Sequence, residues 1–418
     1  MTSLSPEKPA RDDSFQEDAR ATIERIRRLF AAVVEAKCGG GPRAHEVADR
    51  FGVHRKLGWQ IWNVVYDPEP LHGILSMPSE RGLRAWRRAA VQTGLPADLL
   101  DGVDKAAQLY TGMVEKHASD RAMLEMLLET SEPGVDIAAE ERRRAQAFEG
   151  NSYIWGIRAS TYLTTLVVHP SQRAGYIDMM RLHGLIGLVR TRPNVRWPFA
   201  QAVVYSGHDE RFPQRVPLDP TDAVKQTGVP LMTKFCSQPL PPVQRVAGDH
   251  GMLEDELLPG PMGQTGESTI ITGEVARELA PMFKTVPDED AMFGTGVRTP
   301  CQTLVYDHLV HRSLFPDAQR ELRVYSELIS PVSRDERDLL QISERIQFLG
   351  SGLTRLRTAE VPQYMDLLTS ALECAGWDPD DFELYRVRMR YPPMPVAVML
   401  QHQMPDAPDW FVLPRQGS

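Results

Sequence analysis

A basic triplet, His54-Arg55-Lys56, stands directly after a turn signal in the stretch VADRFGVHRKLGWQIWN, which covers residues 47–63. Gly52 interrupts apolar residues that recur at helical spacing on both sides, so the stretch predicts two short helices with a tight turn between them. Arginine and lysine side chains at such a place can bond phosphates and base edges. The alternative is an ordinary helical hairpin whose basic residues lie on a solvated surface.

The stretch resembles the helix-turn-helix motif of bacterial transcriptional regulators over about 20 residues, roughly residues 44–65. In that motif a small residue, here Ala48, packs against the second helix, and a glycine four positions later, here Gly52, takes a left-handed turn. The apolar positions of the motif are filled by Val47, Phe51, Val53 and Ile61. The resemblance implies that a second helix over about residues 53–64 enters the major groove of DNA.

The resemblance also implies which side chains contact DNA. Those expected to read bases are His54, Arg55, Lys56 and Gln60. Arginine and lysine can bond guanine O6 and N7, and glutamine can bond adenine. Near the start of the first helix, Arg43 and His45 are expected to meet phosphate, as are the backbone N–H groups of that helix. Trp59 is a candidate for contact with a backbone phosphate or sugar.

Gly58 departs from the pattern, which usually has a branched apolar residue six positions after the turn glycine. Glycine in a helix interior costs roughly 1 kcal/mol relative to alanine. Either Leu57 fills the core with a shifted helix, or Trp59 and Trp62 close the gap. The register of the second helix therefore stays open at this stage.

The charge distribution favours DNA binding. Over residues 18–62, arginine and lysine exceed aspartate and glutamate by four, whereas the whole chain has a net charge of −9 and a pI of about 5.7. A basic island in an acidic chain is typical of a small module that reads DNA. A second basic strip follows at Arg81, Arg84, Arg87 and Arg88. For this strip a solvated helix face is the stronger interpretation, and added phosphate contacts are the weaker one.

Other groups of chemically capable residues give weaker signals. A metal could be held by Asp307, His308 and His311 if this segment forms a helix. If it forms a strand, the two histidines point to opposite faces. The segment 150–168 combines tyrosines and a tryptophan with small residues, which is more typical of a core than of a ligand pocket. The segment 190–199 clusters three arginines with Trp197 and could grip an anion, although a salt-bridged surface is the stronger interpretation. None of these predicts a catalytic residue, a metal or a cofactor.

The elements that must position these residues fall into two kinds. Residues 1–14 are polar and predict a disordered tail, and helical periodicity then dominates to about residue 130. Further helices are expected at about 138–168, 176–189, 334–349 and 359–376. Strands are expected in FAQAVVYS, VPLMTKFCS, STIITGEV, TPCQTLVYDHLVHRSLF, FELYRVRMRY and PVAVMLQHQM, the last two pairing across PPMP.

The bulk composition limits the class of protein. A chain of 418 residues suits about two or three domains and can bury large cores. The four cysteines are widely spaced without CxxC motifs, which favours a reducing compartment over a zinc ribbon or a disulfide framework. No apolar run predicts a signal peptide or a membrane span, so we expect a cytoplasmic protein.

Together these observations predict an α+β protein: a tail over residues 1–14, a helical DNA-binding region over 15–130 and a mixed region for sensing or oligomerisation over 131–418. The expected function is sequence-specific transcriptional regulation on double-stranded DNA, with a small-molecule effector as a possible partner. A homodimer is expected, with the helices at Phe15–Lys37 and Pro96–Leu128 as dimer surfaces. The alternatives are an enzyme whose site lies in residues 190–330 and a helical adaptor that docks onto a protein.

Overall fold

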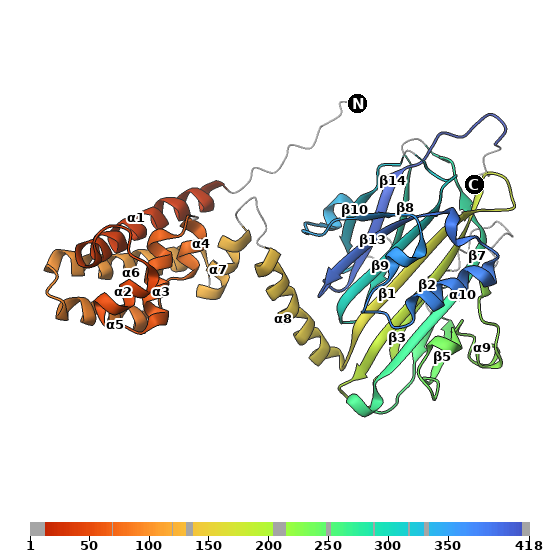
Figure 1. Cartoon of the computed structure of the whole chain (residues 1–418), viewed down its shortest axis with the longest axis horizontal. Helices are drawn as coiled ribbons and strands as arrows, with labels where there is room; N and C mark the ends of the chain where they lie inside the picture. Colours follow the sequence, from red (N-terminus) through yellow and green to blue (C-terminus); the bar gives the residue numbers. More distant parts are fainter. Residues whose placement is uncertain are drawn as a thin grey trace. The chain divides into compact units, whose positions relative to one another are not determined.

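The computed structural model describes residues 13–68, 70–118, 120–130, 137–203, 215–247, 252–286, 289–316, 318–329 and 334–411. The chain divides into two compact units, residues 1–139 and residues 140–418 (Figure 1). The described part of the first unit is helical and the second unit is rich in strands, which confirms the predicted α+β class. Among the described helices, none combines the length and the apolar character that crossing a lipid bilayer requires.

The first unit is built from helices of one to seven turns. They are α1 (Asp13–Cys38), α2 (Ala44–Phe51), α3 (Arg55–Tyr66), α4 (Pro70–Leu75), α5 (Glu80–Gln92), α6 (Ala97–His117) and α7 (Arg121–Thr130). The tail predicted over residues 1–14 is wrong at its end, because α1 already begins at Asp13. The rest of that prediction, residues 1–12, lies outside the described residues.

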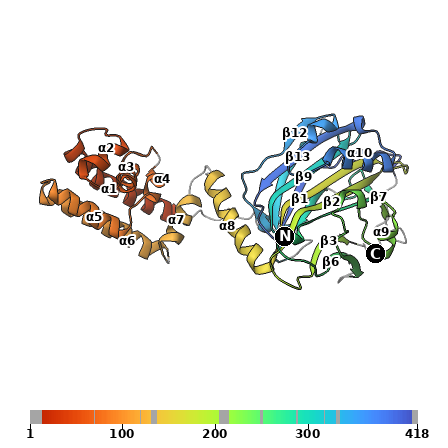
Figure 2. The ribbon, with the colours of Figure 1, turned by 60° about the horizontal axis from the view of Figure 1, so that its bottom comes forward.

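The core of the first unit forms around the apolar stripe of α1, which Figures 1 and 2 show running alongside α6. The stripe predicted from the sequence is fully buried at Ile23, Ile26, Phe30, Val33 and Val34. The apolar side of α6 is likewise buried in the same core. The apolar faces of these helices are therefore covered within one unit, and the prediction that the helices form dimer surfaces now concerns their outer faces alone.

The second unit begins within α8 (Ile137–Trp155), and its described residues form three sheets. The seven-stranded sheet has the order β12 (Gln347–Gly350), β13 (Phe382–Arg390), β9 (Cys301–His311), β1 (Ile157–Pro170), β2 (Tyr176–Arg190), β7 (Ser268–Pro281) and β4 (Arg215–Pro217). The four-stranded sheet has the order β11 (Leu339–Leu340), β10 (Glu321–Ser326), β14 (Val396–Gln403) and β8 (Asp290–Val297). The smallest sheet has the order β3 (Trp197–Val203), β6 (Met252–Leu257) and β5 (Val243–Ala247).

Both faces of the seven-stranded sheet are covered, so the second unit is layered. Helix α10 (Tyr364–Ala375) lies over one face, where the Thr165 and Tyr364 hydroxyls are 2.7 Å apart (Figures 1 and 2). On the other face, the Tyr162 hydroxyl donates to the carbonyl of Gly296 in β8 at 2.7 Å. Residues 162 and 165 serve opposite faces because side chains alternate along a strand.

A buried polar network joins α10 to the centre of the sheet. The Arg386 guanidinium donates from Nε and Nη2 to the two carboxylate oxygens of Asp307, both at 2.7 Å, and the Tyr364 hydroxyl donates to Oδ2 at 2.6 Å. The metal interpretation of Asp307 with its histidines is wrong, because β9 is a strand and Arg386 occupies the carboxylate. Within the described part of the chain, three or more metal-ligating side chains gather nowhere.

Several predicted elements of the second unit have the wrong type. The segment predicted as a helix over residues 138–168 is helix α8 followed by strand β1. The segment predicted as a helix over residues 176–189 is strand β2. Their apolar runs are buried on both faces, so the alternation that identifies a strand is absent. The helix predicted over 334–349 is a 3-10 turn with the short strands β11 and β12. In contrast, α10 confirms the helix predicted over 359–376.

The strand predictions are mostly confirmed, but not their pairing. Strands β3, β7, β9, β13 and β14 lie in the predicted segments, whereas VPLMTKFCS holds an isolated bridge at Leu231 and a 3-10 turn at Thr233–Phe235. The predicted hairpin across PPMP is wrong, since β13 pairs with β9 and β12 while β14 pairs with β10 and β8. The connection between them crosses from one sheet to the other.

Two buried histidines make the second unit sensitive to acid. His308 and His402 stack against Phe293 at centroid distances of 4.9 and 5.9 Å, and no ring nitrogen of either has a hydrogen-bond partner among the described residues. Burial, reinforced by the charge of Arg320, lowers the pKa of His402 to about 4 and holds that of His308 well below its ordinary value. Both rings are therefore neutral in the folded protein at neutral pH.

The unfolded chain takes up these two protons at higher pH than the folded chain does. We therefore expect the second unit to lose stability as the pH falls from about 6.5 toward 4, by about 1.4 kcal/mol per pH unit for each histidine. Urea unfolding between pH 7 and pH 5 measures this slope. His402→Met should remove one histidine's share, and an unchanged slope in that variant would contradict the assignment.

Candidate nucleic-acid interface

Helices α2 and α3 form the predicted pair of helices with a tight turn. Gly52 ends α2 with φ of 65°, a conformation that glycine adopts without steric cost, and the Val53 N–H donates back to Ala48 O at 3.0 Å. Helix α3 begins at Arg55, so the start predicted at residue 53 is two residues early. The reason is that Val53 belongs to the turn and His54 caps the helix, its Nδ1 accepting from the Lys56 N–H at 3.2 Å.

Gly58 is where the two helices touch. A Cβ atom added to Gly58 would lie 2.5 Å from Ala48 Cβ and 2.7 Å from Ala48 Cα, closer than real Cβ atoms approach. Neither alternative raised by the sequence describes this contact: Leu57 is half-buried at the edge of the core, and Trp59 is half-exposed. Instead the helix backbones approach each other directly, which only glycine at position 58 permits.

Helix α3 is anchored along its length by polar contacts. Arg27 of α1 donates from Nη2 to the carbonyls of Val65 and Asp67, both at 2.8 Å, and so satisfies the C-terminal end of α3. Trp62 donates from Nε1 to Pro42 O at 2.7 Å. These contacts fix the rotation and the tilt of α3 in the unit, so that its outer face has a defined direction.

The outer face of α3 carries most of the residues predicted to read DNA. Arg55 and Trp59 are one turn apart, as are Lys56 and Gln60, so the four side chains form one continuous surface. Arg55, Lys56 and Trp59 are exposed, Trp59 by 50%, and Gln60 is partly exposed. Among the described residues, neither Arg55 nor Lys56 has an ion-pair partner, so both charges are available to a ligand.

The residues at the start of α2 are placed less favourably for phosphate. Arg43 and His45 are exposed, as predicted. However, the backbone N–H of Arg43 donates to Glu46 Oε2 at 2.7 Å. The carboxylate of Glu46 thus occupies one of the backbone donors that the sequence assigned to phosphate, and places a negative charge beside it.

The second basic strip lies on α5 and is partly neutralised. Arg84 pairs with Glu80 at 2.9 Å, and Arg87 pairs with Asp104 at 2.8 Å. Arg81 and Arg88 are exposed and form no ion pair with a described residue. Half of the strip is therefore salt-bridged and the other half is solvated, which fits the solvated helix face that the sequence favoured.

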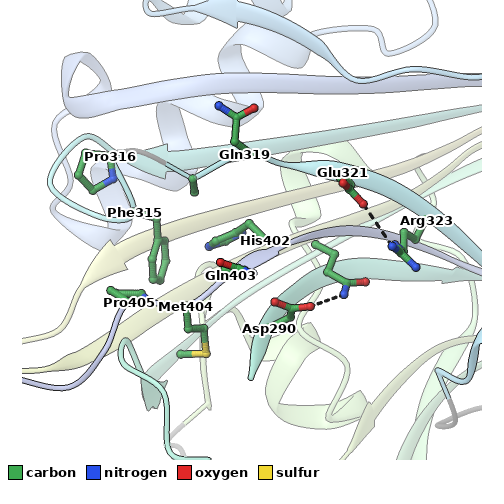
Figure 3. Close-up of a pocket in the computed structure, with 12 residues that line it drawn as sticks. Asp290, Phe315, Pro316, Gln319, Glu321, Arg323, His402, Gln403, Met404 and Pro405 are labelled. Carbon is green, nitrogen blue, oxygen red and sulfur yellow. Dashed lines mark hydrogen bonds and ion pairs between the residues drawn. The ribbon is translucent and has the colours of Figure 1, made fainter. Parts of the chain in front are cut away.

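Two cavities of the second unit were not predicted as such. One, of about 680 Å³, is shown in Figure 3. Two polar contacts lie within it: the neutral amide of Gln401 donates to Asp290 Oδ2 at 2.6 Å, and Arg323 forms an ion pair with Glu321 at 3.3 Å (Figure 3). The buried ring of His402 lies beside them, between Phe315 and the strand β14. Two carboxylates and one guanidinium are among its lining residues, so this cavity does not favour an anionic ligand.

The other cavity, of about 770 Å³, lies between the seven-stranded sheet and the strands β3 and β8. The two segments considered for a ligand contribute four lining residues to it, Trp155, Tyr162, Arg196 and Trp197. Arg190 does not, because it donates to the carbonyl of Leu258. The other lining residues come from distant strands, and no local signal in the sequence connects them.

The two units thus offer different chemistry. The first presents unpaired positive charge beside an exposed aromatic ring on an anchored helix. The second encloses cavities in a layered β structure. No protein-family model matches the chain, and neither does any curated protein or solved structure.

Proposed function

We propose that this protein is a cytoplasmic transcriptional regulator that binds DNA sequence-specifically through α3. The observation that carries the proposal is the outer face of α3, where Arg55, Lys56 and Gln60 project from a helix that is fixed to its unit. Such a helix suits base recognition, because its position in the unit is set before binding and its side chains supply hydrogen-bond donors. All four cysteines are free thiols, in keeping with a reducing compartment.

In this proposal the first turns of α3 enter the major groove. Arg55 bonds guanine O6 and N7 in a bidentate manner, Lys56 adds a second donor, and Gln60 pairs with adenine. His54, Trp59 and the start of α2 face the sugar-phosphate backbone and fix the register. A homodimer places two such helices about one helical turn of DNA apart, on a near-palindromic site.

Selection of genomic DNA with the full chain supplies the target site, and Arg55→Ala then tests the assignment. We expect this variant to weaken specific binding by about 1–3 kcal/mol, or roughly 5- to 150-fold, in fluorescence anisotropy. Arg55→Lys should keep binding to random DNA but lose preference for the site, since lysine lacks the bidentate fork. Arg337→Ala is the matched control, because it removes an exposed arginine of the second unit.

The result that argues against the proposal is equally clear. If selection enriches no site, or if Arg55→Ala binds as tightly as Arg337→Ala, α3 does not read DNA. The half-exposed Trp59 favours one alternative, a protein-docking surface with an aromatic anchor. Salt separates the two functions, because DNA binding falls steeply with salt through counterion release and apolar docking does not.

A further inference from the structure

The cavity of about 770 Å³ has an aromatic wall. Trp197 is held in place by its Nε1, which donates to Thr299 Oγ1 at 2.8 Å, and its ring packs edge-on against Trp155 at 6.0 Å. Phe199 of the same strand stacks with His183 of β2 at 6.3 Å and an interplanar angle of 10°. Flat rings fixed in this way suit a planar ligand, and the volume lies within the usual range for small-molecule sites.

His183 lines this cavity with a buried imidazole ring. Its side chain is 4% exposed, and its buried Nε2 has no hydrogen-bond partner among the described residues. Burial, reinforced by the charge of Arg181, lowers the pKa of His183 to about 3, so the ring is neutral at neutral pH. The buried Nε2 lies beneath the cavity surface, so His183 supports the wall through its ring, which stacks with Phe199.

The remaining wall carries more positive than negative charge. Arg298 donates from Nε to Glu327 Oε2 at 2.9 Å, and Arg334 donates to Oε1 of the same carboxylate at 3.3 Å. Two guanidinium groups thus share one buried carboxylate, and the described residues that line the cavity include four arginines but only one acidic residue, Glu327. In the same way Glu274 lies within 3.5 Å of Arg181 and within 2.6 Å of Arg215. Excess guanidinium charge in a half-enclosed site favours a carboxylate or another anion.

We propose that this cavity binds a small planar aromatic carboxylate. The ring of the ligand lies against Trp197 and Phe199, and its carboxylate meets the guanidinium groups of Arg298 and Arg181. This assignment concerns the second unit alone and stands whether or not α3 binds DNA.

The proposal is tested with 6-hydroxy-2-naphthoate as the probe and its neutral amide, 6-hydroxy-2-naphthamide, as the matched compound. Calorimetric titration of the full chain should show the carboxylate binding at least tenfold more tightly than the amide. Hydrogen exchange of the unmodified protein should slow on binding in β3 and β8. Equal affinity for the two compounds, or protection elsewhere in the chain only, would overturn the proposal.

Arg298→Gln then locates the anionic group, since it removes one of the two arginines at Glu327 and leaves the other in place. We expect at least tenfold weaker binding of the carboxylate and little change for the amide. Arg323→Gln is the control, because Arg323 is a comparable arginine paired with glutamate in the other cavity (Figure 3). If both variants bind the carboxylate alike, the site is wrongly placed. Should Arg298→Gln fail to fold, the acid–amide comparison and the exchange data on the unmodified chain still decide the matter.

Discussion

Replacing Gly58 by valine is expected to destabilise the first unit by about 3 kcal/mol or more, near the upper end of overpacking costs. Valine is the type of residue that the helix-turn-helix pattern usually has at this position. Here, however, its Cβ would lie within 2.7 Å of backbone atoms of Ala48, which cannot move away as a flexible side chain could. Helices α2 and α3 must separate, and the face that carries Arg55 turns with them.

Urea unfolding of the full chain, followed by far-ultraviolet circular dichroism, measures the loss for Gly58→Val. Gly112→Ala is the matched control, since Gly112 is an exposed glycine within α6 with open space around its Cα. Alanine there should stabilise the protein by up to about 1 kcal/mol through its helix propensity. A Gly58→Val protein as stable as the unmodified chain would mean that the two helices do not touch as described.

Replacing Arg386 by methionine is expected to lower the free energy of unfolding of the second unit by about 3–5 kcal/mol. Methionine keeps most of the apolar volume but removes both donors to Asp307, whose side chain is fully buried. Among the described residues, the carboxylate would then retain only the Tyr364 hydroxyl as a partner. The loss of stability arises because the buried carboxylate of Asp307 is no longer compensated by a positive charge. Asp307 lies in β9 and Arg386 lies in β13, so both strands are destabilised.

The matched variant is Arg337→Met, which breaks the exposed pair of Arg337 with Asp335. A solvated pair of this kind contributes little to stability, so the unfolding curve of this variant should nearly superimpose on that of the unmodified chain. Both variants are compared in the urea transition of the second unit. Equal, small losses in the two would show that the Asp307 network adds little to stability.

The sequence was most informative where one face of an element is buried and the other is solvated. The stripe from Ile23 to Val34 in α1 is of this kind, and so is the pattern around Gly52, where a turn needs a residue with positive φ. Gly58 could not be interpreted in the same way. Its role depends on how near α2 lies, a distance that one sequence does not contain.

The large sheet was hidden for a different physical reason. Residues 161–168 of β1 are all buried, because α10 covers one face of the strand and β8 the other. Because this run of apolar residues and threonines lacks the polar alternation of a half-buried strand, its period does not distinguish a helix from a central strand. The wrongly predicted hairpin between β13 and β14 has a related origin. Two alternating segments with a short connection normally predict a pair of neighbouring strands, but here the second segment pairs in a different sheet.

The second cavity illustrates how far a site can be found from sequence alone. Its aromatic residues in two segments were visible as clusters of tryptophan, tyrosine and arginine, because each cluster is local. His183, Arg298 and Glu327 come together only after strands far apart in the sequence have paired and packed. The polar character of the site is therefore a product of topology, and no spacing in the sequence encodes it.

The parallel pairing of β1 with β9 also sets the order in which the protein matures. The two strands join at the centre of the large sheet although their paired residues are about 140 positions apart in the chain. At the usual rates of synthesis, β1 waits roughly ten seconds for its neighbour, while the first unit, with its local contacts, has time to fold. Throughout that interval an apolar strand edge is open to other chains. The nascent protein is thus most prone to aggregate after its helical unit is complete, and chaperones have their greatest effect on its yield at that stage.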